Sequence, residues 1–525
     1  MSIEPSWEPP GPGQWYASPE HLPAPVSTLG GELLAILATG WRTGTDRYGL
    51  PPNTGTFAES NRWYFYGRLE PGPLDLDAME RAAADALARR RWRADLDHWY
   101  RVLRPEVVAE NRALVGVDLP SLPHAGMVDH VEAVLAHFRR RAPEHFAQMP
   151  SAGAALGALF TAAQGWGISR RDLLPLLVGG SSASTSAEAL FDRVATGLRA
   201  AGRTVCTDLA DVEAVGGEAG AALDELWTDY AWRSYVSDVV QPTLAERPEA
   251  MVAGIRAAMS RPGGRTTAHH ASVDDVRARV PAADRAELDD LLAYARLAYG
   301  ANDDNTTVLC GLPLGLVRRA VLELGRRLVA RGRIDAVDDA FEASGAELSE
   351  LGIGGGPPAE VLAARAAARR SAASLTPPAV LGEAAPPTGA ADLPPSTQRL
   401  VAMMSAYEVV AYRAETEEAG RAEATVGEVP VRGRAVVTDD PTDALERLGD
   451  DGILVTRTTT ASYNTVFPGA RGVAVQHGST MSHAAVLARE LGLPAVIGVP
   501  DLLQHVHDGD QVLLDPQAGT ITVIA

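Results

Sequence analysis

One histidine in the last quarter of the chain has neighbours suited to phosphoryl chemistry. The stretch VQHGSTMSHAAVLARELGLPAVIGV, residues 475–499, passes from a short apolar run through a Gly/Ser turn to His483. The residues that follow predict a helix, with Ser482 as its N-cap and His483 in its first turn. The unpaired N–H groups and the positive end of the helix dipole at such a position favour an anion.

An imidazole that is neutral near pH 7 is a nucleophile. A histidine beside an anion-binding helix start can therefore carry a phosphoryl group transiently. The alternative is a histidine in the capping region that only packs, and the local sequence by itself leaves that alternative open.

Strand and helix patterns alternate around this histidine after about residue 425. We expect strands in RGRAVV, GILVTR, GVAVQ and PAVIGV, with helices in PTDALERL and SHAAVLAREL between them. The last stretch, DQVLLDPQAGTITVIA, predicts two strands around a turn. The pattern is typical of a small α/β domain of roughly a hundred residues.

The chain before this domain is predicted to be mainly helical. Residues 1–30 are rich in Pro and Gly and predict an extended arm, whereas residues 76–103 are strongly helix-forming. Residues 371–395 are dense in Pro, Ala and Gly and predict an inter-domain linker, which a connector helix follows. Another helix should end at Gly332 and bury one face, made of Leu316, Ala320, Val321, Leu324 and Leu328.

Composition limits the classes of protein that need to be considered. With 525 residues the chain is too long for one core, and its formal net charge of −20 argues against nucleic acid or an anionic membrane as the main partner. Cys206 and Cys310, with no CxxC and no His/Cys cluster of metal-binding spacing, fit a reducing cytosol and no disulfide framework. We see no signal peptide, and residues 146–169 predict a buried helix rather than a membrane span. These features predict a cytoplasmic protein.

The C-terminal residues resemble the phosphohistidine swivelling domain of phosphoenolpyruvate-utilising enzymes. The family pattern, approximately GGxTSHAAIxARELGIPAVVG, stands here as GSTMSHAAVLARELGLPAVIG, and the resemblance covers essentially residues 425–525. It implies that His483 is the phosphorylated histidine. It also implies a phosphate-binding set around that histidine, formed by Gly478, Ser479, Ser482 and Arg489.

The chain departs from this family pattern at three points. Ser479 stands at the second glycine, Met481 at the threonine, and Gln476-His477 where an acidic residue usually precedes the glycines. These changes are expected either to weaken docking of the swivelling domain or to alter what His483 does. We interpret His477 as a loop histidine rather than a second catalytic group.

The N-terminal region resembles the substrate domain of rifampicin phosphotransferase and related pyruvate,water dikinase-like proteins. The resemblance is carried by GPGQWYASPEHLPAPVSTL, RYGLPPNTGTFAESNRWYFYGRL and LLVGGSSASTSAEALFDRVA, in that order. In that family the histidine takes phosphate from ATP, swings on its linker and delivers the phosphate to a hydroxyl group. The resemblance implies a mainly helical substrate-binding-like domain over 1–370, a linker with a connector helix over 371–424, and a phosphohistidine-type swivelling domain over 425–525.

The nucleotide-binding part of that family is not found in this sequence. There is no GxxxxGK[ST] loop, and the residues before Trp15 are too few for an ATP-grasp domain. We therefore expect ATP to act only through a separate ATP-grasp protein, with Mg²⁺ as the candidate cofactor.

The helical region supplies three further catalytic candidates. Relatives carry Tyr-Gly-His-Arg where this chain has DYAWRS, so Trp232 replaces the histidine while Arg233 remains. The stretch YGANDDN places Asp303 and Asp304 after a helix. Adjacent carboxylates can bind Mg²⁺ or act as general acid and base, but we favour the alternative of a polar loop or a helix-capping group.

Three interpretations of function remain open. In the first, the chain is the substrate-and-swivel component of a split phosphotransferase, and His483 passes a phosphoryl group to a hydroxyl of a mainly apolar small molecule, a natural product or antibiotic. In the second, it is a repurposed lyase, isomerase or cyclase that uses His483 with Asp303 or Asp304 in ATP-independent acid/base chemistry. In the third, it is a binding or regulatory protein that keeps only the fold.

Overall fold

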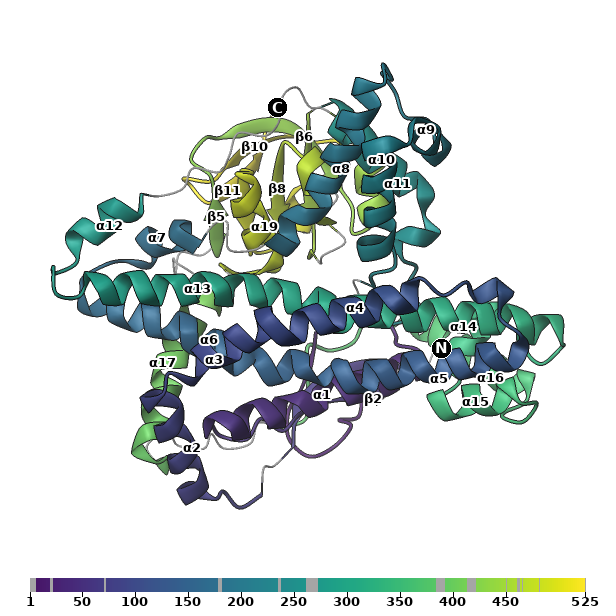
Figure 1. Cartoon of the computed structure of the whole chain (residues 1–525), viewed down its shortest axis with the longest axis horizontal. Helices are drawn as coiled ribbons and strands as arrows, with labels where there is room; N and C mark the ends of the chain where they lie inside the picture. The colour runs from purple at the N-terminus through teal and green to yellow at the C-terminus, as the bar shows by residue number, and fades with distance from the viewer. Residues whose placement is uncertain are drawn as a thin grey trace. The chain divides into compact units, whose positions relative to one another are not determined.

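A computed structural model describes most of the chain and divides it into two compact units that are interleaved along the sequence (Figure 1). Unit 1 contains Met1–Pro150, Trp232–Thr243 and Asn305–Val401, and unit 2 contains Ser151–Ala231, Leu244–Asp304 and Ala402–Ala525. The described residues are 6–18, 22–69, 72–177, 182–234, 238–260, 272–383, 392–412, 422–449, 451–459, 463–464, 466–480 and 482–524.

Unit 1 is mainly helical. Its α-helices are α1 (Thr28–Tyr48), α2 (Leu76–Ala88), α3 (Arg91–His98), α4 (Arg104–Val115), α5 (His124–Arg141), α14 (Leu312–Ala330), α15 (Gly345–Gly352) and α16 (Ala359–Ala372), and α6 (Pro143–Gly165) and α17 (Pro395–Tyr412) begin in it. Short 3₁₀ turns are η2 (Leu119–Ser121) and η7 (Val337–Glu342), and π-helical turns are η1 (Trp99–Leu103) and η6 (Thr306–Gly311).

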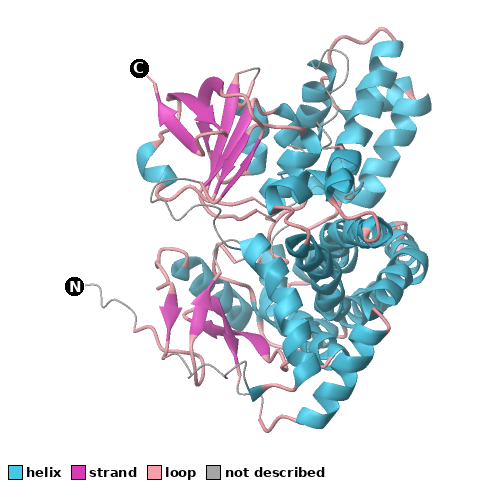
Figure 2. Cartoon of the chain, turned by 90° about the vertical axis from the view of Figure 1, so that its left-hand side faces the viewer, coloured by secondary structure: helices cyan, strands magenta, loops and turns pink. Residues whose placement is uncertain are grey.

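A small antiparallel sheet completes unit 1, in the order β2 (Gly55–Ser60), β3 (Trp63–Arg68), β1 (Trp15–Ala17) and β4 (Val380–Leu381) (Figure 2). Asn61 and Arg62 join β2 to β3 with φ values of 52° and 66°, as a two-residue hairpin requires. β1 pairs with β4 from a distant part of the chain, and Trp15 is buried. The segments predicted as an extended arm and as an inter-domain linker therefore each contribute a strand to one sheet.

The helix predicted to end near Gly332 is confirmed as α14. All five residues of its expected apolar face are buried, and Gly332 follows the helix with φ 64°. The segment 76–103 is helical as predicted, but Arg90, at φ 47°, separates α2 from α3.

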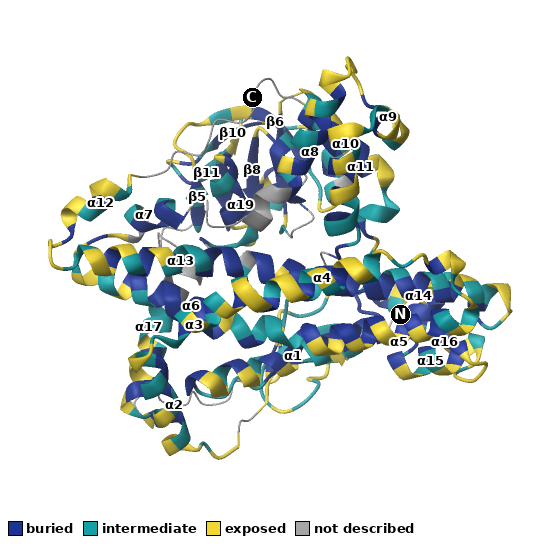
Figure 3. Ribbon diagram, viewed as in Figure 1, coloured by how far each residue is buried: buried dark blue, intermediate teal, exposed yellow. Residues whose placement is uncertain are grey.

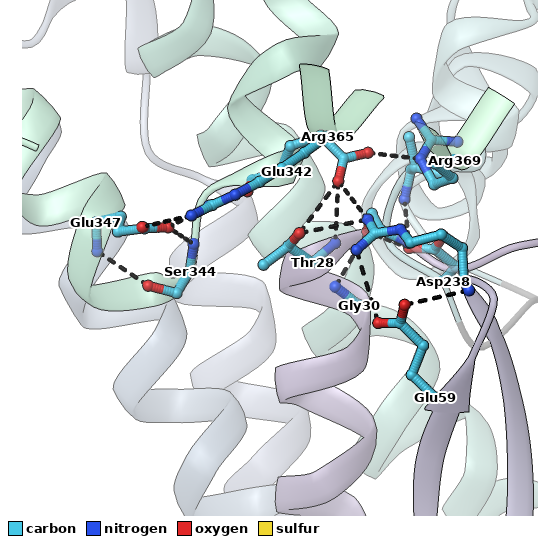
Figure 4. A network of polar contacts seen from close by, with 12 residues as sticks. Thr28, Gly30, Glu59, Asp238, Glu342, Ser344, Glu347, Arg365 and Arg369 are labelled. Carbon is cyan, nitrogen blue, oxygen red and sulfur yellow. Dashed lines mark hydrogen bonds and ion pairs between the residues drawn. The ribbon is translucent and has the colours of Figure 1, made fainter. Parts of the chain in front are cut away.

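A fully buried carboxylate holds the start of α1 in unit 1 (Figure 4). Glu342 accepts from Arg62 Nη2 at 2.7 Å and from Arg369 Nε at 2.6 Å. The backbone N–H and the hydroxyl of Thr28 donate to the same carboxylate at 3.4 and 3.1 Å. Because the first N–H groups of a helix lack partners within the helix, this carboxylate both satisfies and orients α1.

A second carboxylate completes the cap. Asp238 accepts from the backbone N–H and the hydroxyl of Ser27, the N-cap of α1, at 2.8 and 2.6 Å. A Cβ at Gly30 would lie 2.3 Å from Asp238 Oδ1, so glycine is required for this close approach. The N-terminus of α1 thus depends on residues more than 200 positions away in the sequence.

We predict that Glu342→Ala lowers the free energy of unfolding by about 3–5 kcal/mol, because it removes the buried carboxylate that Arg62 and Arg369 share, and these two side chains are only 18% and 15% exposed. The matched control is Asp46→Ala, which removes an ion pair with Arg42 whose side chains are 52% and 55% exposed and should cost less than about 1 kcal/mol. Urea unfolding of both variants measures the difference. Equal effects would contradict the assigned role of Glu342.

Unit 2 combines helices with a large sheet. Its helices are α7 (Arg170–Leu173), α8 (Ser182–Ala200), α9 (Leu209–Val215), α10 (Gly217–Leu226), α11 (Pro248–Ser260), α12 (Val273–Arg279), α13 (Arg285–Asn305), α18 (Pro441–Arg447), α19 (His483–Leu491) and α20 (Leu502–His505), and its short turns are η3 (Leu174–Leu177), η4 (Trp227–Ala231), η5 (Leu244–Glu246) and η10 (Phe467–Gly469). Its strands are β5 (Ala424–Val426), β6 (Val431–Val437), β7 (Gly452–Thr456), β8 (Gly472–Val475), β9 (Ala495–Ile497), β10 (Gln511–Asp515) and β11 (Thr520–Val523).

The seven strands form one sheet in the order β11-β10-β6-β7-β8-β9-β5. The four central strands β6 to β9 are parallel, and the outer strands pair antiparallel. Every strand and helix predicted after residue 425 is present, and β5 is an addition that the sequence pattern did not indicate. The mainly helical first part and the C-terminal α/β sheet domain confirm the predicted multidomain fold class.

Both faces of this sheet are buried, as expected for parallel strands (Figure 3). In β7, Leu454 belongs to the layer that packs under α19, whereas Ile453 and Val455 belong to the layer under α20. This alternation follows from the two-residue period of a strand. The burial fixes α19, and with it His483, relative to the sheet.

None of the helices in the described residues is long and apolar enough to cross a membrane.

Candidate active site

His483 lies at the edge of the sheet where the parallel strands end. β7 ends at Thr456 and β8 at Val475, and these two residues are paired in register. The loop after β8 leads into α19, and the loop after β7 carries Thr459 and Asn464. Ligands of parallel α/β sheets bind at this carboxyl edge, so the topology favours a site here.

Both ring nitrogens of His483 have hydrogen-bonding partners from the loop after β7. Nε2 lies 2.6 Å from Oδ1 of Asn464, and Nδ1 lies 3.3 Å from Oγ1 of Thr459. The ring of Phe467 meets the imidazole edge-on, with centroids 6.4 Å apart. His483 is half-buried, so its ring is oriented by protein contacts yet still meets solvent.

The loop after β7 is itself held by side-chain hydrogen bonds. Oδ1 of Asp439 accepts from the Thr456 hydroxyl at 3.0 Å and from the Arg457 backbone N–H at 2.8 Å. The Tyr463 hydroxyl lies 3.3 Å from Thr456 Oγ1, and burial raises the pKa of Tyr463 well above its ordinary value. Tyr463 therefore stays neutral and anchors the residue next to Asn464.

The start of α19 differs in one respect from the sequence prediction. Ser482 occupies the N-cap position, but its side chain makes no capping bond. Its hydroxyl donates instead to the carbonyl of Ser479 at 2.8 Å, and its backbone N–H donates to the same carbonyl at 3.0 Å. Because the Ser482 hydroxyl turns away, it does not compete for the first-turn N–H groups that an anion would use.

Gly478 is required by packing where the loop passes over β9. A Cβ at this position would lie 2.7 Å from Ile497 Cγ2 and 3.0 Å from Ser482 Oγ. The carbonyl oxygen of Gly478 also lies 2.6 Å from where a Cβ would stand on Gly498. Two glycines therefore allow the loop before His483 to lie directly against the sheet.

We predict that Gly478→Ala destabilises the sheet domain by about 1–3 kcal/mol, because the added methyl group overlaps Ile497. Gly469→Ala is the control, since the nearest atom to its new Cβ is Ala257 Cβ at 3.8 Å, an ordinary contact. Hydrogen exchange along β8 and β9 measures both variants. Unchanged exchange in Gly478→Ala would show that the loop moves aside without cost.

Arg489 ties the last turn of α19 back to the loop. Its Nη1 donates to the carbonyl of Thr480 at 2.5 Å. The Thr480 side chain is only 2% exposed, and its hydroxyl has no hydrogen-bond partner within the part of the chain that the structure describes. Arg489 thus adds positive charge and rigidity to the loop, while its proposed contact with phosphate stays a prediction.

The sequence-predicted candidates of the helical region lie on α13 and just after η4, not on the loops around His483. Asp303 and Asp304 belong to α13 and are followed directly by the π-helical turn η6, so the prediction that they follow a helix is wrong. Asp304 is 4% exposed, and the side chain of Asp303 lies outside the described residues. Arg233 is 8% exposed and lies in unit 1, whereas His483 lies in unit 2. In unit 1 the guanidinium of Arg319 stacks over Trp232, the residue at the family's histidine position, at 5.2 Å.

The helices of unit 2 pack against the domain that carries His483. α8 contacts α19, and α11 contacts both α18 and η10. Arg247, which precedes α11, forms an ion pair with Asp440 at the start of α18, with 3.2 Å between Nη1 and Oδ1. This pair is one charged contact between the helices and the sheet domain.

We predict that Arg247→Ala raises amide hydrogen exchange in α18 by a factor on the order of five or less, because exposed ion pairs contribute less than about 1 kcal/mol. The effect should fade in high salt. Arg193→Ala serves as the control, because Arg193 pairs with Glu218 and Glu225 instead. If Arg247→Ala leaves amide hydrogen exchange in α18 unchanged, the ion pair does not stabilise the contact between α11 and α18.

Sequence reasoning missed Thr459, Asn464 and Thr480. The usable signal was the polar stretch that follows a buried strand, since loops after neighbouring parallel strands share one edge of a sheet. Thr459 and Asn464 lie in such a stretch, TRTTTASYN, after β7.

Of the other histidines near the C-terminus, His505 and His507 are exposed, and His477 is an exposed loop residue. No group of three or more His, Cys, Asp or Glu side chains in the described residues is arranged to hold a metal ion.

The sequence around this site matches a known domain family. Residues 448–519 match the mobile domain of PEP-utilising enzymes. The match contains β7, β8, α19 and the loops between them, which confirms the resemblance seen in the sequence.

Several curated proteins are similar to a part of the chain. A rifampicin phosphotransferase from Streptomyces sp is 34% identical over 151 residues, which are 29% of this chain and 15% of that protein. The prodigiosin synthesizing transferase PigC from Serratia marcescens is 34% identical over 103 residues, 19% of this chain and 11% of PigC. The uncharacterized phosphotransferase YvkC from Bacillus subtilis is 37% identical over 73 residues, 14% of this chain and 9% of YvkC. The matched segments thus span less than a sixth of the length of these relatives.

Proposed function

We propose that this chain, whose C-terminal part is a mobile domain of the PEP-utilising enzyme type and is phosphotransferase-like, carries a phosphoryl group on His483 and passes it to a hydroxyl of a mainly apolar small molecule. The observation that carries the proposal is the position of His483, in the first turn of α19 and hydrogen-bonded through both ring nitrogens. A nucleophile is most useful when its orientation is fixed and its charged product is stabilised.

The reaction has two steps. First, a lone pair of the His483 imidazole attacks the γ-phosphorus of ATP, the bond from that phosphorus to the β–γ bridging oxygen breaks, and ADP leaves. In the second, the acceptor oxygen attacks the same phosphorus, the N–P bond breaks, and the hydroxyl proton leaves to the released imidazole. The first-turn N–H groups of α19 and the positive helix end favour the phosphoryl oxygens between the two steps.

A separate ATP-grasp protein is proposed as the source of the phosphoryl group. Mg²⁺ is proposed to arrive with the nucleotide, since the donor groups described in this chain do not form a metal site. In the phosphoryl step Mg²⁺ would neutralise charge on the nucleotide.

Two observations support an apolar small molecule as the acceptor. The names of two relatives refer to rifampicin and to prodigiosin synthesis. Unit 1 also contains half-buried aromatic rings that stack on one another, with Trp41 4.0 Å from Phe146 and 5.2 Å from Tyr66 between centroids. Partly exposed aromatic rings suit an apolar ligand with few charges.

We predict that incubation with ATP, Mg²⁺ and the partner ATP-grasp protein adds one phosphate to the chain, and that His483→Ala abolishes the addition. Intact mass measured under mildly alkaline conditions, where phosphohistidine survives, is the readout. His505→Ala is the matched control, because His505 is exposed in the same domain and should leave the mass change intact.

The outcomes separate the alternatives. Phosphate that appears in His483→Ala would move the carrier to another residue. If no pairing yields phosphate, but His483→Ala still removes an activity that needs no ATP, then the acid/base interpretation with Asp303 or Asp304 replaces this one.

A further inference from the structure

Four aromatic side chains of unit 1 lie against one another. Trp41 of α1 stacks on Phe146 of α6, with ring centroids 4.0 Å apart and 21° between the ring planes. Tyr66 of β3 meets Trp41 edge-on, at 5.2 Å and 68°, and Phe57 of β2 lies 5.7 Å from Trp41 between centroids. Because Phe146 is stacked on Trp41 and Tyr66 stands perpendicular to it, the four rings form an L-shaped arrangement, which we call the aromatic corner.

The backbone around the aromatic corner leaves room for the indole of Trp41. A Cβ on Gly40 would lie 1.8 Å from the carbonyl oxygen of Pro143, so glycine lets α1 approach α6 at this point. A Cβ on Gly55 of β2 would lie 2.6 Å from Cε3 of Trp41. The close approach of α1 to α6 and the space above β2 therefore fix where the indole lies.

The rings of the aromatic corner are half-buried, unlike those of the neighbouring core. Tyr48, on the same helix as Trp41, and Phe65, next to Tyr66 on β3, are both 0% exposed. Successive side chains of a strand point to opposite faces, so Phe65 and Tyr66 lie on opposite faces of the small sheet. The face that carries Tyr66 thus keeps aromatic surface in contact with solvent.

The apolar surface continues from the aromatic corner across the small sheet. In the register of the strands, Tyr66 lies opposite Phe57 on one side and opposite Tyr16 on the other, and Tyr16 lies opposite Val380. Residues directly opposite each other share a face of the sheet. Tyr16 is 44% exposed and Val380 is 39% exposed. A contiguous apolar surface of this kind marks a binding site, whereas single exposed apolar residues do not.

We propose that the aromatic corner is a binding site for a small molecule with a flat, conjugated ring system. A flat ring can stack on one wall of the corner and present its edge to the other, and the quadrupoles of aromatic rings favour both arrangements. A saturated ring system of the same size buries a similar apolar area but lacks these two contacts. That this molecule is the phosphoryl acceptor rests on the proposed function, whereas its binding to the corner does not.

The test measures binding to the full chain without nucleotide. The probes are 2-naphthol, a flat bicyclic alcohol, and decahydro-2-naphthol, its saturated counterpart. Ligand-observed NMR titrations give both dissociation constants. We expect 2-naphthol to bind about tenfold more tightly, the difference that one or two aromatic pairs supply.

Two variants of Trp41 and one control locate the site. Trp41→Leu removes one wall but keeps an apolar side chain, so the preference for 2-naphthol over the saturated alcohol should disappear. Trp41→Phe keeps a smaller ring and should retain that preference, which separates the loss of a ring from a loss of folding. The control is Trp166→Leu, because Trp166 is also half-buried but lies in unit 2, where its Nε1 donates to Asp284 at 3.2 Å. It should leave both dissociation constants unchanged.

Failure of this inference and failure of the proposed function give different results. Equal binding of the two alcohols would overturn the assignment of a flat ligand, and a preference for 2-naphthol that survives in Trp41→Leu would overturn the location. If His483 is phosphorylated but neither alcohol binds, the aromatic corner is not the site and the carrier function stands. If 2-naphthol binds through Trp41 but no phosphate is found on His483, the aromatic corner stands and the carrier function is contradicted.

Discussion

Parallel strands direct their carboxyl ends to one edge of a sheet, and the arrangement around His483 depends on this constraint. Beyond the last pair of β7 and β8, the backbone N–H of Gln476 still donates to Thr456 at 3.0 Å, and that of His477 to Arg457 at 2.8 Å. The two loops therefore leave the sheet side by side. One loop brings His483 on its helix and the other brings the residues that orient the ring, so the register of two strands sets the geometry of the site.

This constraint explains what the sequence could predict. His483, its helix and the flanking strands follow from local patterns, namely a turn, an amphipathic segment and β-branched runs, and all of them are present. Asn464 and Thr459 lie 19 and 24 residues before the histidine that they contact. No periodicity relates such positions, because their meeting depends on the strand register. The same limit applies to β4, where Val380 and Leu381 are drawn from a proline-rich stretch by pairing with β1.

The local sequence pattern was also insufficient to predict the environment of the carboxylates in the helical region. Asp303 and Asp304 look like loop residues because Asn and Asp disfavour helices, yet tertiary burial carries α13 through them into the turn η6. Glu342 and Asp238 had no signal beyond their charge, although they satisfy the start of α1 from more than 200 residues away. A buried carboxylate is stabilised by hydrogen-bond donors that folding brings to it from distant parts of the chain. Its role therefore cannot be predicted from the local sequence.

The departures from the family pattern are compatible with this geometry. No side chain fits at Gly478, but Ser479 contributes only its carbonyl oxygen to the turn and is not among the residues with a left-handed backbone, so serine can replace the second glycine without strain. Gln476 stands in place of an acid and accepts a backbone N–H at 3.1 Å. Glu423, the residue before β5, has its pKa raised by burial, and the nearby His477 partly offsets this rise.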